Sequence, residues 1–217
     1  AIADEVIAIV RAAGVRVFED QAGAKLNGNT GNLICLPPKF DPNAPALVLS
    51  AHLDTVQPTA QLHPIIKSDR ICSDGATILG ADNRLGLTVL VHLLCTLAHE
   101  QMPHKNFFVV FTVAEEIGML GANQLDLARY NIQSGLVFDC SRRPGVYIRE
   151  CVGAAMFQAK FIGKAAHAGV APEHGVNAIA LASKALAQIP TGRIDADTTV
   201  NFGKISGGGP PNVVLTC

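Results

Sequence analysis

Hydrophobic positions in the first half of the chain follow helical and extended spacings in turn. Residues 2–13 carry apolar side chains three or four positions apart, which predicts a helix that ends at Gly14. Residues 84–98 are apolar on nearly every side, which predicts a buried helix. Short apolar runs typical of strands lie at 15–18, 32–36, 46–50, 107–113, 135–139 and 146–150, and a helix is expected near 119–128. Strands that alternate with helices favour a layered α/β domain with a mostly parallel sheet.

The pattern changes near Cys151, after which small residues become frequent. The remaining sequence predicts a strand at 154–162, a helix at 176–189 and a strand at 198–205. These elements suit a second, smaller α+β unit. We therefore expect two domains, at 1–151 and 152–217.

Composition narrows the class of protein. The 217 residues are 49% hydrophobic and 16% charged, enough to bury a substantial core. A net charge of −1 without a basic block argues against a nucleic-acid partner. The sequence contains no apolar stretch of about 18 residues, so we expect no membrane span. The first residues lack the pattern of a signal peptide, which favours the cytoplasm.

Two adjacent glutamates, Glu115 and Glu116, end an apolar run that begins at Asn106. Ionised carboxylates are rarely buried unless they are paired or bind a metal. One glutamate could ligate a cation while its neighbour transfers a proton, which indicates an enzyme. Taken alone, the pair could instead be stabilised by the dipole at a helix N-terminus.

Further candidate ligands lie at the ends of apolar runs or in turns. His52 and Asp54 share a face of an extended segment, and a carboxylate near an imidazole can orient the ring for zinc. Asp82 lies between a glycine-containing turn and a helix start, and Asp139 ends another run. Because ligand sites in open α/β sheets lie beyond the carboxyl ends of strands, we expect one or two divalent metals here. Taken alone, His52 could be structural and Asp139 a cap residue.

Short motifs in a characteristic order cover nearly the whole chain. They are His52-Leu-Asp-Thr-Val, Ile78-Leu-Gly-Ala-Asp-Asn, Phe111-Thr-Val-Ala-Glu-Glu-Ile-Gly-Met-Leu-Gly-Ala, Phe138-Asp, Gly163-Lys-Ala-Ala-His-Ala-Gly, Pro172-Glu-His-Gly-Val-Asn-Ala-Ile, Gly192-Arg-Ile-Asp and Gly207-Gly-Gly-Pro-Pro-Asn-Val-Val. Together they resemble the peptidase T-like branch of the dizinc exopeptidases, a family that includes aminoacylases and glutamate carboxypeptidases. The resemblance implies a layered catalytic domain with a mostly parallel sheet and a lid or dimerisation domain, which is incomplete here.

The resemblance also implies a dinuclear metal site. His52 would ligate one metal, with Asp54 holding its ring, and Asp139 would complete that metal's protein ligands. Asp82 would bridge both metals, next to a cis Asp82–Asn83 peptide bond, and Glu116 would bind the second metal. A further histidine ligand for the second metal is expected in a C-terminal part that family members have and this chain lacks, so we expect a fragment.

Three more roles follow from the resemblance. Glu115 would be the general base that accepts a proton from the attacking water and passes it to the leaving amine. His167 would stabilise the developing oxyanion in the site of a partner subunit, within a homodimer formed through the lid domain. Asn212 would contact the substrate. Taken alone, His167 could be a surface loop residue and Asn212 a turn residue.

The expected function is metal-dependent hydrolysis of short peptides, of the aminopeptidase or tripeptidase type. Two divalent ions are expected as cofactors, with zinc preferred and cobalt or manganese also suited to these ligands. Two alternatives stay open. The chain could be a non-catalytic fragment that binds metal or dimerises, or the same site could serve an aminoacylase or carboxypeptidase.

Overall fold

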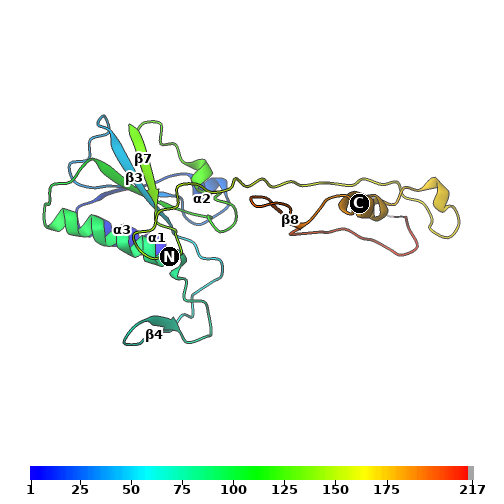
Figure 1. Cartoon of the computed structure of the whole chain (residues 1–217), viewed down its shortest axis with the longest axis horizontal. Helices are drawn as coiled ribbons and strands as arrows, with labels where there is room; N and C mark the ends of the chain where they lie inside the picture. The colour runs from blue at the N-terminus through cyan, green and yellow to red at the C-terminus, as the bar shows by residue number, and fades with distance from the viewer. Residues whose placement is uncertain (215–217) are drawn as a thin grey trace. The chain divides into compact units, whose positions relative to one another are not determined.

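The computed structural model describes residues 1–214 and divides the chain into two compact units, of which the first spans Ala1–Val146 and the second begins at Tyr147 (Figure 1). The division at 151/152 that the sequence favours stays a prediction. Within the described residues, no helix combines the length and the apolar character that crossing a membrane requires.

A five-stranded sheet forms the centre of the first unit. Its order is β1 (Arg16–Glu19), β2 (Leu33–Leu36), β6 (Phe107–Thr112), β3 (Ala46–His52) and β7 (Ile132–Val137). Strand β3 pairs in parallel with both β6 and β7, whereas β2 is antiparallel to β1 and β6. Four of the five strands therefore run in the same direction, which confirms the expected α/β class with a mostly parallel sheet.

Strand β6 lies in the middle of the sheet and is buried along its whole length. Phe107, Val109 and Phe111 pack in a core with the helices α1 (Ile2–Ala12) and α3 (Ala81–His99). The alternate residues Phe108 and Val110 face a second core on the other side of the sheet. Successive strand residues point to opposite faces, so an apolar run without alternation is what a strand buried on both faces requires.

The second core is largely aromatic. The ring of Phe40 lies edge-on to Phe108 and to Tyr130, with centroid separations of 5.6 and 5.8 Å. Phe108 and Tyr130 are 4.6 Å apart. Such pairs stabilise a fold by about 0.5–1.5 kcal/mol beyond the area they bury, and here they cover the side of the sheet opposite α1 and α3.

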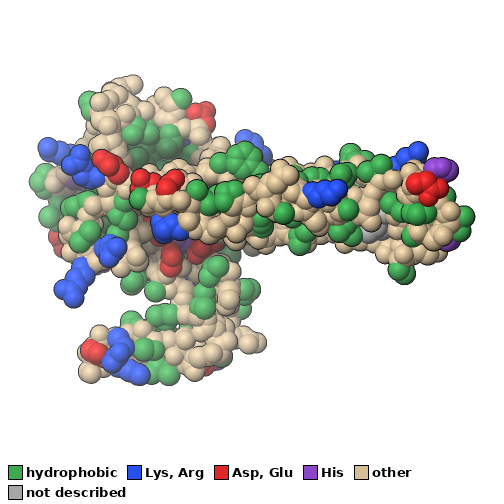
Figure 2. Space-filling model, turned by 45° about the vertical axis from the view of Figure 1, so that its right-hand side comes forward, with side chains coloured by type: hydrophobic (Ala, Val, Ile, Leu, Met, Phe, Trp, Pro, Cys, Tyr) green, Lys and Arg blue, Asp and Glu red, His purple; other side chains and the backbone are tan. Residues whose placement is uncertain are grey.

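Several predicted elements are absent or shorter. The prediction of a helix near 119–128 is wrong. Only the 3-10 turn η1 (Ala122–Gln124) forms there, because Gly118 and Met119 have positive φ angles, of 111° and 55°. The strands expected at 146–150 and 154–162 are also wrong. Their alternating side chains find no partner strand among residues 1–214, and Met156 and Phe157 are over 90% exposed. Hydrophobic side chains are accordingly visible on the surface of the second unit (Figure 2).

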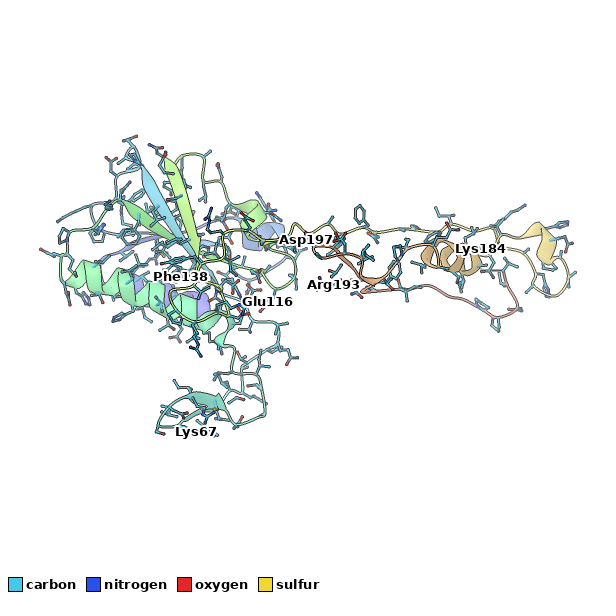
Figure 3. The ribbon with its side chains drawn as sticks, in the orientation of Figure 1. Lys67, Glu116, Phe138, Lys184, Arg193 and Asp197 are labelled. Atoms are coloured by element: carbon cyan, nitrogen blue, oxygen red, sulfur yellow. The ribbon has the colours of Figure 1, made fainter. Side chains whose placement is uncertain are left out.

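Three short elements of the first unit were not predicted. The helix α2 (Ala22–Lys25) follows β1, and the strands β4 (Pro64–Ile66) and β5 (Ile71–Ser73) form an antiparallel hairpin. This hairpin extends away from the sheet, with Lys67 in its turn (Figure 3). Three-residue strands give too little periodicity for the sequence pattern to identify them.

The second unit contains few regular elements among its described residues. Helix α4 (Ala178–Leu186) is capped by Asn177, whose side chain accepts a hydrogen bond of 3.0 Å from the Ala180 amide. The 3-10 turn η2 (Pro172–His174) precedes it, and β8 (Gly192–Arg193) pairs with β9 (Thr199–Val200). The helix predicted at 176–189 is therefore confirmed, whereas the strand predicted at 198–205 shrinks to β9.

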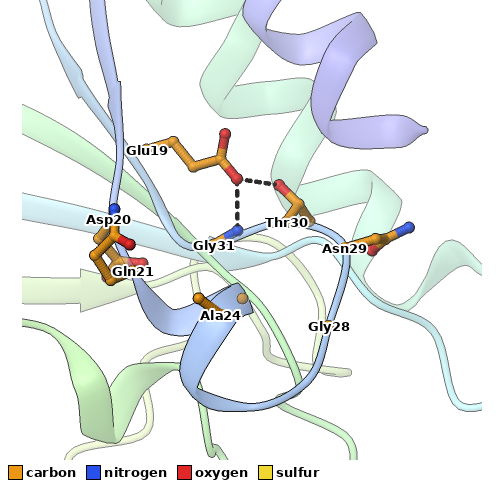
Figure 4. A pocket seen from close by; sticks show the side chains of 9 residues that line it. Glu19, Asp20, Gln21, Ala24, Gly28, Asn29, Thr30 and Gly31 are labelled. Atoms are coloured by element: carbon orange, nitrogen blue, oxygen red, sulfur yellow. Dashed lines mark hydrogen bonds between the residues drawn. The ribbon is translucent and has the colours of Figure 1, made fainter.

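A buried asparagine connects the loop after β1 to the end of β6. Asn32 is fully buried, and its Nδ2 donates to Asp20 Oδ2 at 2.7 Å and to the Gly121 carbonyl at 2.8 Å. Its Oδ1 accepts from the Val113 amide at 3.0 Å. The preceding loop is closed by Glu19, which accepts from Thr30 Oγ1 and the Gly31 amide beside a shallow pocket (Figure 4). The residues that line this pocket include none of the predicted site residues.

Replacing Asn32 with alanine should destabilise the first unit by about 3 kcal/mol, because it leaves the buried Val113 amide without an acceptor. Urea denaturation of the two proteins measures the difference. Asn29→Ala, which changes an exposed asparagine of the same loop, is the control and should shift stability by less than about 0.5 kcal/mol. Equal stabilities of Asn32→Ala and Asn29→Ala would contradict this account.

Candidate metal centre

The parallel strands bring the predicted ligands to one edge of the sheet. His52 is the last residue of β3 and lies opposite Thr112 of β6, so the chain beyond β6 reaches Glu115 at the same level. Asp139 follows β7, whose Val137 pairs with Ser50 of β3. Glu116 and Phe138, the residue before Asp139, are labelled in Figure 3.

His52 is the centre of this group and is 3% exposed. Its Nε2 lies 2.9 Å from Asp82 Oδ1 and 3.8 Å from both Glu115 Oε2 and Asp139 Oδ2. Its Nδ1 lies 2.9 Å from the backbone carbonyl of Asp54, an acceptor, so Nδ1 carries a proton. A neutral His52 then aims the lone pair of Nε2 at three carboxylates, an arrangement that requires a cation or a second proton between them.

Asp54 has a different contact from the one expected. Its Oδ1 lies 3.6 Å from His52 Nδ1, so the backbone carbonyl, and not the carboxylate, makes the hydrogen bond to the ring. The carboxylate instead accepts from the amides of Glu115 and Glu116, each at 3.1 Å. Asp54 therefore connects the end of β3 to the glutamate pair that follows β6.

The described residues offer two overlapping sets of metal ligands. One consists of His52, Glu115 and Asp139, and the other of His52, Asp82 and Glu116, with the ligand atoms in each set within 4.8 Å of one another. Imidazole nitrogen and carboxylate oxygen suit zinc and similar divalent ions. The donor atoms therefore fit a metal, and the four predicted ligands come together here with the predicted base, Glu115.

Burial and mutual repulsion disturb the titration of these groups. Burial is the largest cause that raises the pKa of Glu115, and the negative charges of Asp139 and Glu116 add to it, against the opposing effect of His52. Burial and Asp82 likewise raise the pKa of Asp139. For His52, burial lowers the pKa, but the carboxylates of Asp82 and Asp139 outweigh it and the net shift is upward. A cation would relieve the repulsion among these carboxylates.

The start of α3 brings Asp82 to the site through close backbone packing. The Asp82–Asn83 peptide bond is cis, as the resemblance implies. A Cβ atom at Gly86 would overlap both the Asn83 side chain and the Phe138 carbonyl, so this glycine allows α3 to approach the end of β7. Asn83 is 4% exposed, and its Nδ2 has no hydrogen-bond partner among the described residues. The sequence pattern predicts no role for Asn83 or Gly86, although both lie close to Asp82 along the chain.

The two remaining predicted residues, His167 and Asn212, come together in the second unit. The Ala168 amide donates to the Asn212 carbonyl at 3.0 Å, and His167 forms an antiparallel bridge with Val213. The segments around both residues are thus paired, although 43 residues lie between Ala168 and Asn212 along the chain.

Asp54→Asn should weaken metal binding about 10- to 100-fold, as loss of an outer contact to metal ligands typically does. In the variant, the side-chain NH₂ group would face one of the two backbone N–H groups from which the carboxylate now accepts hydrogen bonds. Two donors would then face each other, and that hydrogen bond would be lost. Titration with Zn²⁺ measures the affinity, and Asp69→Asn in the β4–β5 turn is the control. Unchanged affinity in Asp54→Asn would show that the glutamate pair does not need this contact.

The raised pKa of Glu115 also predicts a pH dependence. A carboxyl group whose pKa is higher in the folded chain stabilises the fold below its unfolded pKa and loses that contribution as pH rises through the folded value. In EDTA, Glu115→Gln should therefore raise the melting temperature relative to wild type more at about pH 7.5 than at about pH 4.5. Glu100→Gln, at the exposed end of α3, should show the same small difference at both values. A pH-independent difference for Glu115→Gln would refute the expectation.

Comparisons with known proteins agree with this geometry. Residues 32–168, more than half of the chain, match the model of Peptidase family M28, and residues 150–217 match the Peptidase dimerisation domain. The chain is 37% identical over 201 residues to YqjE of Bacillus subtilis (strain 168), covering 93% of this chain and 54% of that protein. It is 36% identical over 129 residues to Peptidase T of Pectobacterium carotovorum (strain PC1), covering 59% of this chain and 31% of that protein.

Two solved structures of peptidases are similar to this chain over nearly its whole length. The aminopeptidase PepT of Bacillus cereus has a TM-score of 0.72 and 36% identity, over 99% of this chain and 57% of its own. A tripeptidase of Staphylococcus aureus has a TM-score of 0.72 and 32% identity, over 98% of this chain and 57% of its own. The chain thus spans about half the length of these structures. It belongs to Peptidase family M28, carries a peptidase dimerisation domain and is related to Peptidase T.

Proposed function

We propose that the first unit carries the catalytic residues of a metal-dependent peptidase that removes N-terminal residues from short peptides. The observation that carries this proposal is that His52 Nε2 lies within 3.8 Å of the carboxylates of Asp82, Glu115 and Asp139. The names aminopeptidase and tripeptidase, which belong to the related structures, supply the substrate class.

The proposed cofactor is a pair of divalent ions, with zinc first and cobalt or manganese as alternatives. His52, Asp82 and Asp139 would hold one ion, and Asp82 and Glu116 the other. Such ions polarise a peptide carbonyl and lower the pKa of water. The crowding of negative charge around one imidazole supports this assignment.

Glu115 is the proposed general base. Its carboxylate would accept a proton from the attacking water and return it to the amine of the departing residue. Its raised pKa supports the role, because proton transfer in both directions is most efficient when the pKa approaches the working pH. Asp54 would keep Glu115 in place through the hydrogen bond that its carboxylate accepts from the Glu115 backbone amide.

The second unit has two proposed roles, which rest on the family resemblance and on the matched dimerisation domain. It would form a homodimer, and it would supply His167 as a hydrogen-bond donor to the oxyanion in the partner subunit's site. Asn212, which lies beside the His167 turn, would contact the peptide.

A second candidate is metal binding or dimerisation without peptide cleavage. An aminoacylase or carboxypeptidase with the same site differs in substrate, because it accepts a blocked N-terminus that an aminopeptidase rejects.

The test is cleavage of tripeptides with free and acetylated N-termini, by this chain and by the longest form its gene encodes. We expect metal-dependent release of the first residue from the free peptide, and a loss of about 10²–10⁴-fold in kcat for Glu115→Gln. Glu100→Gln is the control and should keep full activity. Cleavage of the acetylated peptide alone would replace the aminopeptidase with an acylase, and metal binding without cleavage by either form would favour the second candidate.

A further inference from the structure

The ring of His167 receives two backbone hydrogen bonds on one nitrogen. The amides of Gly169 and Val170 both lie 3.2 Å from His167 Nδ1. A backbone N–H group can only donate, so Nδ1 must accept and cannot carry a proton in this arrangement. In the neutral ring the proton then lies on the other nitrogen, Nε2.

The turn that holds these amides is closed by its own backbone and by a second segment. The Ala171 amide donates to the His167 carbonyl at 3.1 Å, and the Val214 amide donates to the Ala166 carbonyl at 2.9 Å. Together with the Ala168–Asn212 contact, these bonds fix both sides of the turn. Backbone hydrogen bonds therefore hold the amides of Gly169 and Val170 in place, without help from a side chain.

Other histidines of the chain show that this arrangement is particular to His167. The Nδ1 atoms of His52 and His104 each lie 2.9 Å from a backbone carbonyl, which requires the proton on Nδ1. His174, whose side chain is 75% exposed, has only a 3.8 Å contact to Glu173. The backbone thus selects Nδ1–H at His52 and His104 and the opposite tautomer at His167.

We propose that the amides of Gly169 and Val170 are positioning groups that hold His167 in the Nε2–H tautomer, as a neutral hydrogen-bond donor. An Nε2–H group cannot ligate a metal, but it binds an oxygen acceptor such as a peptide carbonyl or the oxyanion that forms from it. The role in catalysis rests on the proposed peptidase function, whereas the tautomer itself does not.

The first measurement is the ¹⁵N–¹H correlation pattern of the histidine rings at about pH 8.5, above the ordinary imidazole pKa of about 6.5. His167→Gln identifies the His167 signals, and His104 and His174 are internal references within the same sample. We expect Nε2–H alone at His167, Nδ1–H at His104 and a mixture at His174. A mixture at His167 that matches His174, or a proton on Nδ1, would overturn the proposal.

Val170→Pro removes one of the two donors, together with the 3.3 Å contact of the same amide to the His167 carbonyl, and Val170→Ala keeps both contacts. This pair of variants therefore separates the amide from the side chain. In Val170→Pro, the tautomer ratio of His167 should move toward that of His174, while Val170→Ala should match wild type. Unchanged backbone amide signals in α4 would show that the second unit stays folded. A wild-type ratio in a folded Val170→Pro would refute the role of the amide.

Activity separates this proposal from the peptidase function. In a form that cleaves peptides, Val170→Pro should lower kcat about tenfold or more with little change in KM, and Val170→Ala should not. Full kcat in Val170→Pro would overturn the positioning role even if the peptidase function holds. If no form cleaves peptides, the peptidase function fails, and the ring spectra still decide which tautomer the amides impose.

Discussion

The chain that leaves β6 has to find acceptors for its backbone N–H groups outside the sheet, and side chains from neighbouring strands supply them. Asn32, just before β2, accepts from Val113, and Asp54, just after β3, accepts from both Glu115 and Glu116. Leaving such groups unpaired in a buried place costs about 1–3 kcal/mol each. The same hydrogen bonds that satisfy the backbone therefore determine where the two glutamates lie.

Charge is the second organising factor. His52 is nearly buried, and the carboxylates of Asp82, Glu115 and Asp139 approach one of its nitrogens from different segments. Close packing at Gly86 keeps the start of α3, which carries Asp82, beside Phe138, the residue before Asp139. The fold thus maintains an excess of negative charge around one imidazole. A bound divalent cation would neutralise this charge.

The sequence predicted much of the first unit, because burial there leaves a strong pattern. The uninterrupted apolar run of β6 follows directly from cores on both faces of one sheet. The prediction that α3 is buried on all sides is wrong, because α3 packs in one core only and its Leu85 and Val89 are 69% and 52% exposed. The sequence pattern also failed at 119–128, where positive φ at Gly118 and Met119 overrides helical spacing, and at 154–162, where alternating side chains have no partner strand among the described residues. The identities of the site residues could be read from motifs, but the amide contacts of Asp54 and His167 could not, because they depend on which backbone groups a turn leaves free.

Strand β7 ends the sheet on the side opposite β1, and its outer backbone groups have no strand partner among residues 1–214. Val137, at its carboxyl end, is 71% exposed. An open edge of this kind is a template to which a further strand can add. Such a strand could come from a longer form of the chain or from a second molecule. A proline in β7 would prevent both kinds of addition, because it removes a backbone N–H group.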